Sequence, residues 1–453
     1  MAGIAGAISD GTEEETLDVV ERMSMKLSHR GEERTFRLRV KNDCLVVIKT
    51  RSRPLESLIV KEDIERIVIV EGGEQANSLL ISVNHEGLEM KRKLFSMKPL
   101  YYFRRGNFLL FSSERKALWE VGIQNVTSLQ PGQNLKITGV ADRIAIRESK
   151  KTPPSYVQDL PHDEIIRRLE IALRASFTRI RGRRVGVLFS GGVDSSLIAL
   201  LAKEACKDVQ LYSASSAPFH DRLAAASAAD ALCLNLNGVE INTDDVWEVL
   251  PRLLYSIESA NLMDVEISLP FYLASRQASN DGISLMLSGQ GPDELFAGYA
   301  RHVRIFKEDG EEALDAKLWQ EVMTTHENNI ERDERAIAAH GLEAFFPYLS
   351  TRFIELGLGI PSRWKVHLGE QPERKVIFRE LAQQLGLPES IHATPKKATQ
   401  YSSGSSRILM KSLSENVKEM TGIPRKEQRR EAQKILYALA SEIGVFREST
   451  ADG

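Results

Sequence analysis

Apolar and polar positions follow different patterns on the two sides of residue 153. On the N-terminal side the apolar residues form short runs that are typical of strands. Within residues 13–28, single apolar residues instead recur at helical spacing. The runs are Cys44 to Ile48, Ile67 to Val70, Ser78 to Val83, Phe108 to Phe111 and Leu135 to Ile137. The polar segment 148–156 contains two consecutive prolines, which argue against a regular element there. The pattern predicts an α+β domain over residues 1–153.

Residues 154–453 show another order. An amphipathic helix is predicted at 163–180, then a buried strand at 185–189, a helix that reaches about residue 204 and a strand at 209–213. Because strand, helix and strand follow one another, the pattern predicts a doubly wound parallel sheet in an α/β domain. Further predicted elements are a helix at 220–234, a strand at 283–287 and helical segments at 311–339, 373–386, 406–420 and 425–444.

The first strand of that sheet leads into the sequence Ser-Gly-Gly-Val-Asp-Ser at residues 190–195. Glycines let a backbone approach a ligand closely, and the N-terminus of the helix that follows attracts anions. The carboxylate of Asp194 repels a bare phosphate unless a cation lies between them. The segment therefore predicts a site for a nucleotide with Mg²⁺.

The strand at 283–287 also ends in a glycine loop, Ser288 to Tyr299. Doubly wound sheets bind ligands beyond the carboxyl ends of their strands, so we expect both loops to converge on one ligand. The predicted nucleotide-binding residues are Leu188, Ser190, Gly191, Gly192, Asp194, Ser195, Ser213, Ser288 and Gly289, and the predicted metal ligands are Asp194 and Asp293.

Composition narrows the classes of function. A net charge of −3 with 27% charged residues shows no bias towards nucleic acid. The three cysteines lack the spacing of a zinc or redox site, and no apolar run approaches the roughly 18 residues of a membrane span. We expect a cytoplasmic protein that binds neither nucleic acid nor a membrane. The basic cluster between Arg425 and Arg430 is interpreted as a solvated helix surface, because acidic residues lie within it.

The loop at 190–195 resembles the pyrophosphate loop of the ATP pyrophosphatases. Together with several separated motifs, it makes the second domain, residues 154–453, similar to the synthetase domain of the asparagine synthetase family. These motifs are Asp221 with Ala225 and Ala229, Glu258 to Arg276, Ser288 to Tyr299, His340 to Leu349, Lys375 with Arg379, and Lys396 or Lys397 before Gln400. The resemblance implies an ATP pyrophosphatase fold with a helical C-terminal part and ATP and Mg²⁺ as cofactors. It also implies catalytic roles for Lys375, Lys396, Lys397 and Gln290.

The first domain resembles the class II glutamine amidotransferase domain of the same family, which implies a reduced Ntn-hydrolase-like αβ domain. Met1 to Gly6, His29 to Gly31, Lys98 to Tyr102 and Ser112 to Lys116 match its motifs. Residue 2 is Ala, where the family uses a cysteine freed by methionine removal, and the Asn-Gly-Glu-Ile-Tyr-Asn segment is absent. Without that thiolate we expect no covalent attack on glutamine.

The synthetase domain also departs from the family pattern. Gln290 replaces a glutamate, Glu266 stands where arginine is usual, and Phe345 and Ser350 replace an arginine and an aspartate. Glutamine cannot accept a proton at neutral pH, and the loss of arginines weakens recognition of a substrate carboxylate. These departures leave the identity of the acceptor substrate open.

We expect an ATP-dependent ligase that activates a carboxylate, aspartate by default, as an acyl-adenylate and then joins it to an amine. The amine would come from ammonia or another small molecule, and a homodimer or a separate glutaminase partner stays open. Alternatives are a ligase with another acceptor or an intramolecular amine, as in the β-lactam synthetases, a tRNA-modifying ATP pyrophosphatase, or a silent interaction protein. The lack of a reactive cysteine pair argues against the tRNA enzyme, and the retained Asp194, Asp293 and Lys375 argue against the silent protein.

Overall fold

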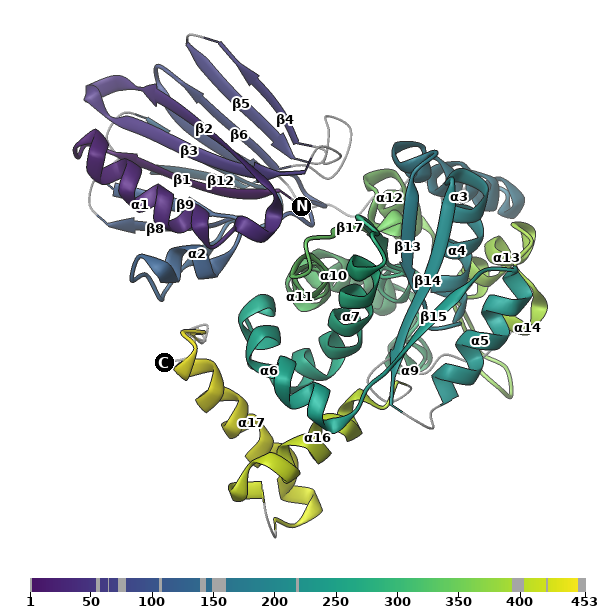
Figure 1. Cartoon of the computed structure of the whole chain (residues 1–453). Helices are drawn as coiled ribbons and strands as arrows, with labels where there is room; N and C mark the ends of the chain where they lie inside the picture. The colour runs from purple at the N-terminus through teal and green to yellow at the C-terminus, as the bar shows by residue number, and fades with distance from the viewer. Residues whose placement is uncertain are drawn as a thin grey trace. The chain divides into compact units, whose positions relative to one another are not determined.

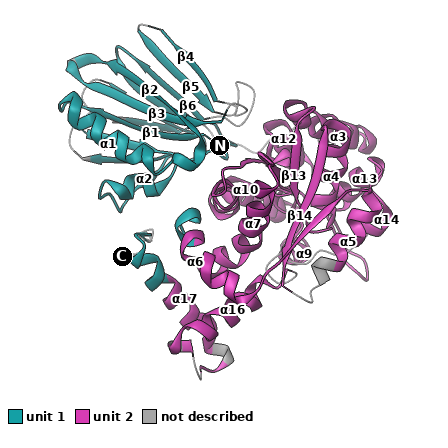
Figure 2. Cartoon of the chain, in the orientation of Figure 1, with its two compact units in different colours: residues 1–151, 254–260, 437–453 teal, residues 152–253, 261–436 magenta. Residues whose placement is uncertain are grey.

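The computed structural model describes residues 2–53, 58–63, 65–71, 79–105, 108–138, 144–148, 160–216, 220–392, 403–420 and 423–446. The chain divides into two compact units (Figure 2). Unit 1 comprises Met1–Lys151, Leu254–Ala260 and Tyr437–Gly453, and unit 2 comprises Thr152–Leu253 and Asn261–Leu436. Most of the predicted polar linker at 148–156 lies outside the described residues.

Unit 1 contains two six-stranded antiparallel sheets (Figure 1). The first has the order β10 (Thr127–Ser128), β8 (Tyr101–Arg105), β9 (Phe108–Ser112), β1 (Gly3–Ser9), β3 (Leu45–Ser52), β2 (Glu32–Arg39). The second has the order β12 (Ile144–Glu148), β11 (Gln133–Thr138), β7 (Gly87–Arg92), β6 (Leu79–Asn84), β5 (Arg66–Glu71), β4 (Leu58–Glu62). Each of the five predicted apolar runs corresponds to a strand, although β3 begins one residue after Cys44 and Ser78 lies outside the described residues. The α+β prediction is confirmed.

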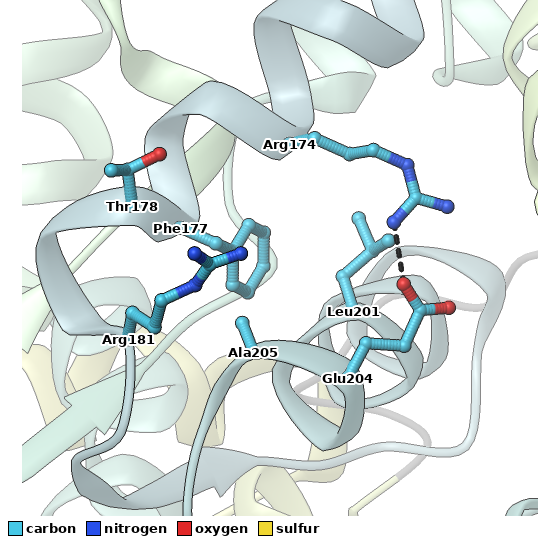
Figure 3. A pocket seen from close by; sticks show the side chains of 7 residues that line it. All are labelled: Arg174, Phe177, Thr178, Arg181, Leu201, Glu204 and Ala205. Atoms are coloured by element: carbon cyan, nitrogen blue, oxygen red, sulfur yellow. Dashed lines mark hydrogen bonds and ion pairs between the residues drawn. The ribbon is translucent and has the colours of Figure 1, made fainter.

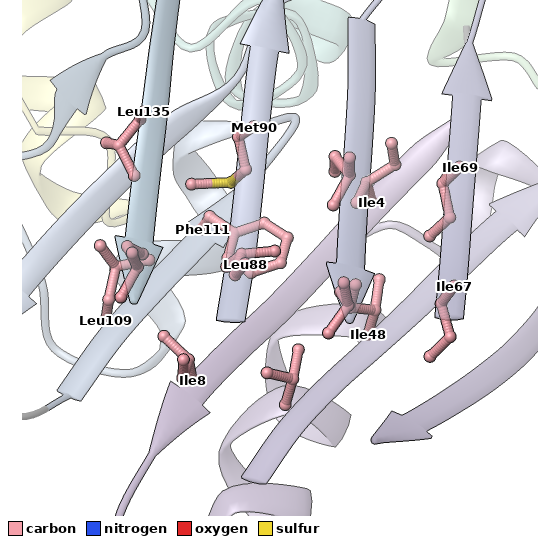
Figure 4. Packing of buried hydrophobic residues seen from close by; sticks show 14 of the residues in the cluster. Ile4, Ile8, Ile48, Ile67, Ile69, Leu88, Met90, Leu109, Phe111 and Leu135 are labelled. Atoms are coloured by element: carbon pink, nitrogen blue, oxygen red, sulfur yellow. The ribbon is translucent and has the colours of Figure 1, made fainter. Parts of the chain in front are cut away.

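The core of unit 1 follows from the alternation of side chains along the strands. Ile4 and Ile8 of β1 point towards the second sheet, where they pack with Ile67 and Met90 (Figure 4). The intervening alanines point to the opposite face, against helices α1 (Glu13–Met25) and α2 (Arg115–Glu120). The unit therefore has one helical layer packed on two stacked sheets.

The start of α1 is fixed by its cap. Thr12 accepts a hydrogen bond from the Glu15 amide, and the Glu15 carboxylate accepts one from the Thr12 amide, which completes a capping box. The helix predicted at 13–28 ends at Met25, and a separate 3₁₀ turn follows at Ser28–Arg30.

Unit 2 is built on a five-stranded parallel sheet. Its order is β15 (Leu236–Glu240), β14 (Asp208–Ser215), β13 (Arg184–Leu188), β16 (Leu285–Leu287), β17 (Glu343–Phe345). The order reverses between β13 and β16, so the carboxyl end of β13 lies at a topological switch point, where such sheets bind ligands. The predicted doubly wound α/β sheet is confirmed.

Helices complete unit 2. They are α3 (His162–Phe177), α4 (Val193–Ala205), α5 (His220–Leu232), α6 (Thr243–Ile257, whose last turn belongs to unit 1), α7 (Leu262–Asn280), α8 (Pro292–Leu295), α9 (Ala300–Asp309), α10 (Glu311–Thr325), α11 (Glu331–Ala338), α12 (Thr351–Gly359), α13 (Val376–Gln384), α14 (Glu389–His392), α16 (Ser405–Asn416) and α17 (Arg425–Glu442, whose end joins unit 1). The region after residue 300 is not purely helical. It contributes β17 to the main sheet and forms a small hairpin of β18 (Val366–His367) and β19 (Glu373–Arg374).

The helices of the described residues were compared with the requirements of a membrane-spanning helix. None of the helices there combines the length and the apolar character that crossing a bilayer requires.

Candidate active site

The loop after β13 is held by its own serines. The Ser190 amide donates to Ser195 Oγ over 3.2 Å, and the two hydroxyl oxygens lie 3.2 Å apart. Ser195 Oγ also donates to the Gly192 carbonyl. Helix α4 begins at Val193 with Gly192 as its N-cap and no side chain capping it. No side-chain cap therefore occupies the start of α4, the end of a helix that attracts anions.

Glycine is required at position 191. Its φ of +75° is left-handed, and a Cβ there would lie 2.6 Å from the Ala224 carbonyl oxygen of α5. Ala225 lies equally close, at 2.8 Å from Cα. The small residues of α5 thus allow this helix to pack directly against the loop.

The second glycine loop contacts the first. A Cβ at Gly289 would lie 3.0 Å from the Asp194 carbonyl carbon and 3.0 Å from the Ser195 nitrogen. Asp194 is held from another side by Tyr348, whose hydroxyl donates to the Asp194 carbonyl oxygen over 2.9 Å. The two loops therefore meet at the start of α4, at the switch point of the sheet.

The two predicted metal ligands converge on one buried lysine. Lys375 Nζ lies 2.7 Å from each carboxylate oxygen of Asp194 and 2.9 Å from Oδ1 of Asp293. The lysine is only 2% exposed. Burial lowers the pKa of Lys375, and the neighbouring Asp194 opposes that shift. The site thus brings together two carboxylates and one cation from three separate segments.

The helix predicted at 373–386 would place Lys375 inside it. In the structure, Lys375 lies just before the helix. It has a φ of +57° and serves as the N-cap of α13, which begins at Val376. This left-handed conformation is uncommon for a residue with a side chain. Gly298 makes room for the arrangement, because a Cβ there would lie 1.9 Å from Asp293 Oδ1 and 2.4 Å from Lys375 Cε.

The carboxylate pair fits a magnesium ion bound together with a nucleotide. Mg²⁺ in such sites takes one or two protein carboxylates and completes its shell with phosphates and water. Among the described residues, no group of three or more His, Cys, Asp or Glu side chains is arranged to hold a metal. Asp194 and Asp293 alone match the smaller donor set.

The remaining predicted residues occupy the same edge of the sheet, as far as they are described. Leu188 is the last residue of β13, Ser213 lies near the end of β14, and Ser288 follows β16. Lys396 and Lys397 lie outside the described residues.

Gln290 has partners that the sequence did not indicate. Its Nε2 donates to Oδ2 of Asp333 over 2.7 Å, and Asp333 is fully buried in α11. Arg332 donates from Nε to the other oxygen of Asp333 over 2.8 Å. Burial raises the pKa of Asp333, and the adjacent Arg332 opposes that rise. In the sequence, Asp333 is one of several charged residues in the run 331–335 and belongs to none of the matched motifs.

Glu294, next to Asp293, is a second buried acid that the pattern missed. Tyr299 donates to it over 2.6 Å and Asn329 over 3.1 Å. Burial raises the pKa of Glu294, and hydrogen bonding to Tyr299 counters the rise. These contacts give the Tyr299 of the second loop a structural role.

The Arg429 side chain is 50% exposed, as expected for a solvated helix surface, but it also pairs with a buried carboxylate that the pattern did not reveal. Its two terminal nitrogens lie 2.6 and 3.1 Å from the two oxygens of Glu266, a carboxylate that is 1% exposed. Ser406 donates to the same carboxylate over 2.7 Å. A buried carboxylate needs such partners, and spacing along α17 alone does not reveal them.

One cavity of unit 2 lies away from these residues (Figure 3). It has a volume of about 170 Å³ between the C-terminal ends of α3 and α4, with Phe177, Leu201 and Ala205 as apolar lining. Arg174 at its rim is paired with Glu204. Asp194 is at the opposite end of α4, so this cavity does not mark the candidate site.

His340, from the matched His-Gly-Leu-Glu motif, gives a prediction about stability. Burial lowers its pKa to about 4, and its ring lies 4.2 Å from that of Tyr272. Below pH 6.5, His340 binds a proton in the unfolded chain but stays neutral in the folded protein. The free energy of unfolding therefore falls as the pH drops towards 4. We expect a contribution of about 2 kcal/mol to the loss between pH 7 and 4.5.

Urea unfolding at pH 7 and 4.5 measures this loss. His340→Gln should reduce the difference between the two pH values, whereas His85→Gln, at a 72% exposed side chain, should not. An equal pH dependence in wild type and His340→Gln contradicts the assignment.

A parallel sheet that carries glycine loops, converging carboxylates and a buried lysine at its carboxyl edge defines an α/β domain of the nucleotide-binding class. The sequence comparisons specify the family. The asparagine synthase family model matches residues 168–311 and 305–440. The chain belongs to this family, whose members are ATP-using carbon–nitrogen ligases, and the predicted resemblance is confirmed.

Individual relatives agree with this assignment. The chain is 34% identical over 369 residues to a putative glutamine-hydrolysing asparagine synthetase of Methanocaldococcus jannaschii, covering 72% of this chain and 68% of that protein. It is 27% identical over 226 residues to asparagine synthetase 2 of Lotus japonicus, covering 46% of this chain and 36% of that protein. The NH₃-dependent NAD synthetase structure from Campylobacter jejuni aligns over 64% of this chain and 100% of that one with 14% identity and a TM-score of 0.28, too low to support an argument.

Proposed function

We propose that the chain is a ligase that joins a carboxylate to an amine through an acyl-adenylate. The convergence of Asp194, Asp293 and Lys375 beside the 190–195 loop is the observation that carries the proposal. An oxygen of the acceptor carboxylate attacks the α-phosphorus of ATP, and pyrophosphate leaves with the electrons of the broken P–O bond. The amine nitrogen then attacks the acyl carbon, AMP leaves with the C–O bonding pair, and the nitrogen loses a proton to water.

The residues of the site divide this work. The amides of the loop and the hydroxyls of Ser190 and Ser195 bind phosphate oxygens, and Asp194 and Asp293 hold Mg²⁺. The metal, when bound, neutralises charge on the phosphates. Lys375 supplies fixed positive charge for the leaving pyrophosphate, a role that we also propose for Lys396 and Lys397.

Aspartate is the default acceptor, by analogy with the named relatives. One observation favours another acceptor or an intramolecular amine. Glu266 stands where the family uses arginine, and its buried carboxylate already takes both terminal nitrogens of Arg429. In the family, the arginine at this position offers a guanidinium to an acidic acceptor side chain. Here the acceptor would meet the carboxylate of Glu266, which is already paired with Arg429.

The test is exchange of labelled pyrophosphate into ATP, with Mg²⁺ and a panel of carboxylates that begins with aspartate and contains no amine. The proposal expects at least one acceptor to support exchange, followed by AMP and amide formation when ammonia is added. Failure of every acceptor to support either reaction contradicts the proposal.

Asp194→Asn and Asp293→Asn should each reduce acceptor-dependent exchange by about 10²-fold, as expected for a lost magnesium ligand. Asp208→Asn removes a carboxylate that pairs with the exposed Arg184 and should leave exchange unchanged. If both site variants retain exchange but melt at lower temperature, the aspartates merely stabilise the helices that they begin.

A further inference from the structure

The ammonium group of Lys375 is fully engaged by the two candidate metal ligands. Its Nζ lies within 2.9 Å of three carboxylate oxygens, which are both oxygens of Asp194 and Oδ1 of Asp293. That number matches the N–H groups that an ammonium can donate. Lys375 therefore occupies the space between the two carboxylates.

Asp194 and Asp293 cannot hold this ammonium and a magnesium ion together. Both cations need the same oxygens, and at such short range their charges repel each other. Lys375 must therefore turn away when the two aspartates bind a metal. Its side chain is only 2% exposed, so the displaced charge needs a new anionic partner.

Glu294 offers such a partner. It directly follows Asp293 and is 3% exposed, and its Oε1 accepts hydrogen bonds from Tyr299 over 2.6 Å and from Asn329 over 3.1 Å. No described residue donates a hydrogen bond to its buried Oε2. A buried polar atom in this state lowers stability, and each such atom in a native structure needs an explanation.

The charges of Lys375 and Glu294 lie close enough to act on each other. Burial raises the pKa of Glu294, and both Tyr299 and the charge of Lys375 oppose that rise. Burial lowers the pKa of Lys375, and Glu294 opposes this shift together with Asp194. A long, flexible lysine side chain therefore lies near an anchored carboxylate that has one unused oxygen.

We propose that Glu294 receives the Lys375 ammonium when Asp194 and Asp293 bind Mg²⁺. This inference rests on the proposed function, which assigns the metal to these two aspartates. Lys375 keeps the two carboxylates paired until the metal arrives. Glu294 is a positioning residue that holds the displaced lysine beside the metal ligands, where its charge still serves the leaving pyrophosphate.

The affinity for Mg²⁺ tests the inference without acceptor, amine or turnover. It is measured by calorimetry in the presence of a non-hydrolysable ATP analogue. Glu294→Gln keeps the shape of the side chain but removes the charge that receives the lysine. The Kd for Mg²⁺ should therefore rise about tenfold, the value of a charge-assisted hydrogen bond.

Glu343→Gln is the matched control. Glu343 is also buried, and its Oε2 likewise accepts no hydrogen bond from the described residues. It is the first residue of β17, at the amino edge of the sheet, opposite the candidate site. Its replacement should leave the Kd for Mg²⁺ unchanged.

A double-mutant cycle with Lys375→Met tests the coupling. Without the ammonium no charge has to move, so Glu294→Gln should not change the Kd for Mg²⁺ in the Lys375→Met background. An equal loss of affinity in both backgrounds would mean that Glu294 acts on the metal directly. An unchanged Kd in folded Glu294→Gln would mean that the lysine moves elsewhere, such as to the phosphates. Either result overturns the proposal.

If Glu294→Gln does not fold, a crystal structure of the wild type with Mg²⁺ and the analogue carries the test. Lys375 Nζ should then lie within hydrogen-bond distance of Glu294 Oε2, and Nζ still between the two aspartates overturns the inference. Absence of acceptor-dependent exchange in a protein that shows the coupled Mg²⁺ affinity would contradict the proposed function alone, so the two failures are distinguishable.

Discussion

Replacing Lys375 with methionine should reduce acceptor-dependent pyrophosphate exchange by about 10²- to 10³-fold. The ammonium group lies within 3 Å of both Asp194 and Asp293. Methionine retains much of the length and volume of the side chain but removes its charge. The pyrophosphate would then leave without that fixed charge, and the two carboxylates would repel each other.

The same substitution should destabilise the protein by about 3–5 kcal/mol, because it removes the buried ammonium that pairs with the partly buried Asp194 and the buried Asp293. Mg²⁺ with ATP should restore part of this loss, because the metal brings positive charge to the same two carboxylates. Thermal unfolding with and without Mg²⁺-ATP measures both effects independently of turnover.

Lys365→Met is the matched control. Lys365 is 1% exposed, burial lowers its pKa to about 8, and it faces Asp315 rather than the glycine loops. Its loss should lower stability but leave exchange by the folded protein unchanged. Equal exchange in the Lys375→Met and Lys365→Met variants would show that Lys375 serves stability alone.

The sequence pattern predicted those parts of the site that are formed by residues adjacent in the sequence. The apolar run before Ser190 and the glycines after it identified a buried strand and a loop. The rule for parallel sheets then placed Asp194 and Asp293 at one edge, where the structure has them. Lys375 came from a motif, but neither its burial nor its contact with both carboxylates is visible in the pattern, because 181 residues separate it from Asp194.

Buried charges limited the prediction elsewhere. The segment 311–339 shows an amphipathic charged pattern, and its charges suggest a solvated face. Within α11, however, Glu331 to Arg335 are all at most 5% exposed. Their mutual ion pairs make this burial tolerable, and such pairs depend on tertiary contacts. Asp333, the partner of Gln290, was hidden in the sequence for this reason.

The last prediction concerns nitrogen. Purified protein should release no glutamate from glutamine, with or without ATP, although the relatives named above are described as glutamine-hydrolysing. Position 2 is occupied by Ala2, which is 1% exposed and whose nitrogen donates to Glu71 over 2.8 Å. A methyl side chain offers no nucleophile, so the acyl-enzyme route is closed.

The cysteines of the chain do not replace the missing nucleophile. Cys44 is buried just before β3, and the pairing of Ser9 with Leu45 places it at the far end of β1 from Ala2. At about 3.4 Å per residue, that separation is roughly 20 Å. Burial raises the pKa of Cys206 to about 11, which disfavours the reactive thiolate. Cys206 and Cys233 also belong to unit 2.

The retained His-Arg-Gly motif has a structural role in unit 1. Arg30 is 4% exposed and donates to Glu114 over 2.5 Å, and Lys116 lies 2.5 Å from the other oxygen of the same carboxylate. These cations hold the pKa of buried Glu114 well below its usual value. Arg30 is therefore engaged inside the unit, and its contacts there need no bound glutamine.

A glutamate-release assay with glutamine at saturating concentration, run beside ammonia-dependent amide formation by the same preparation, decides the matter. We expect amide from ammonia, or from an amine on the substrate, and no glutamate above background. Cys44→Ala, Cys206→Ala and Cys233→Ala combined are the control for a relocated thiol. Glutaminase activity that survives the triple substitution would mean that unit 1 activates glutamine without a cysteine, and the structural role argued for it would be wrong.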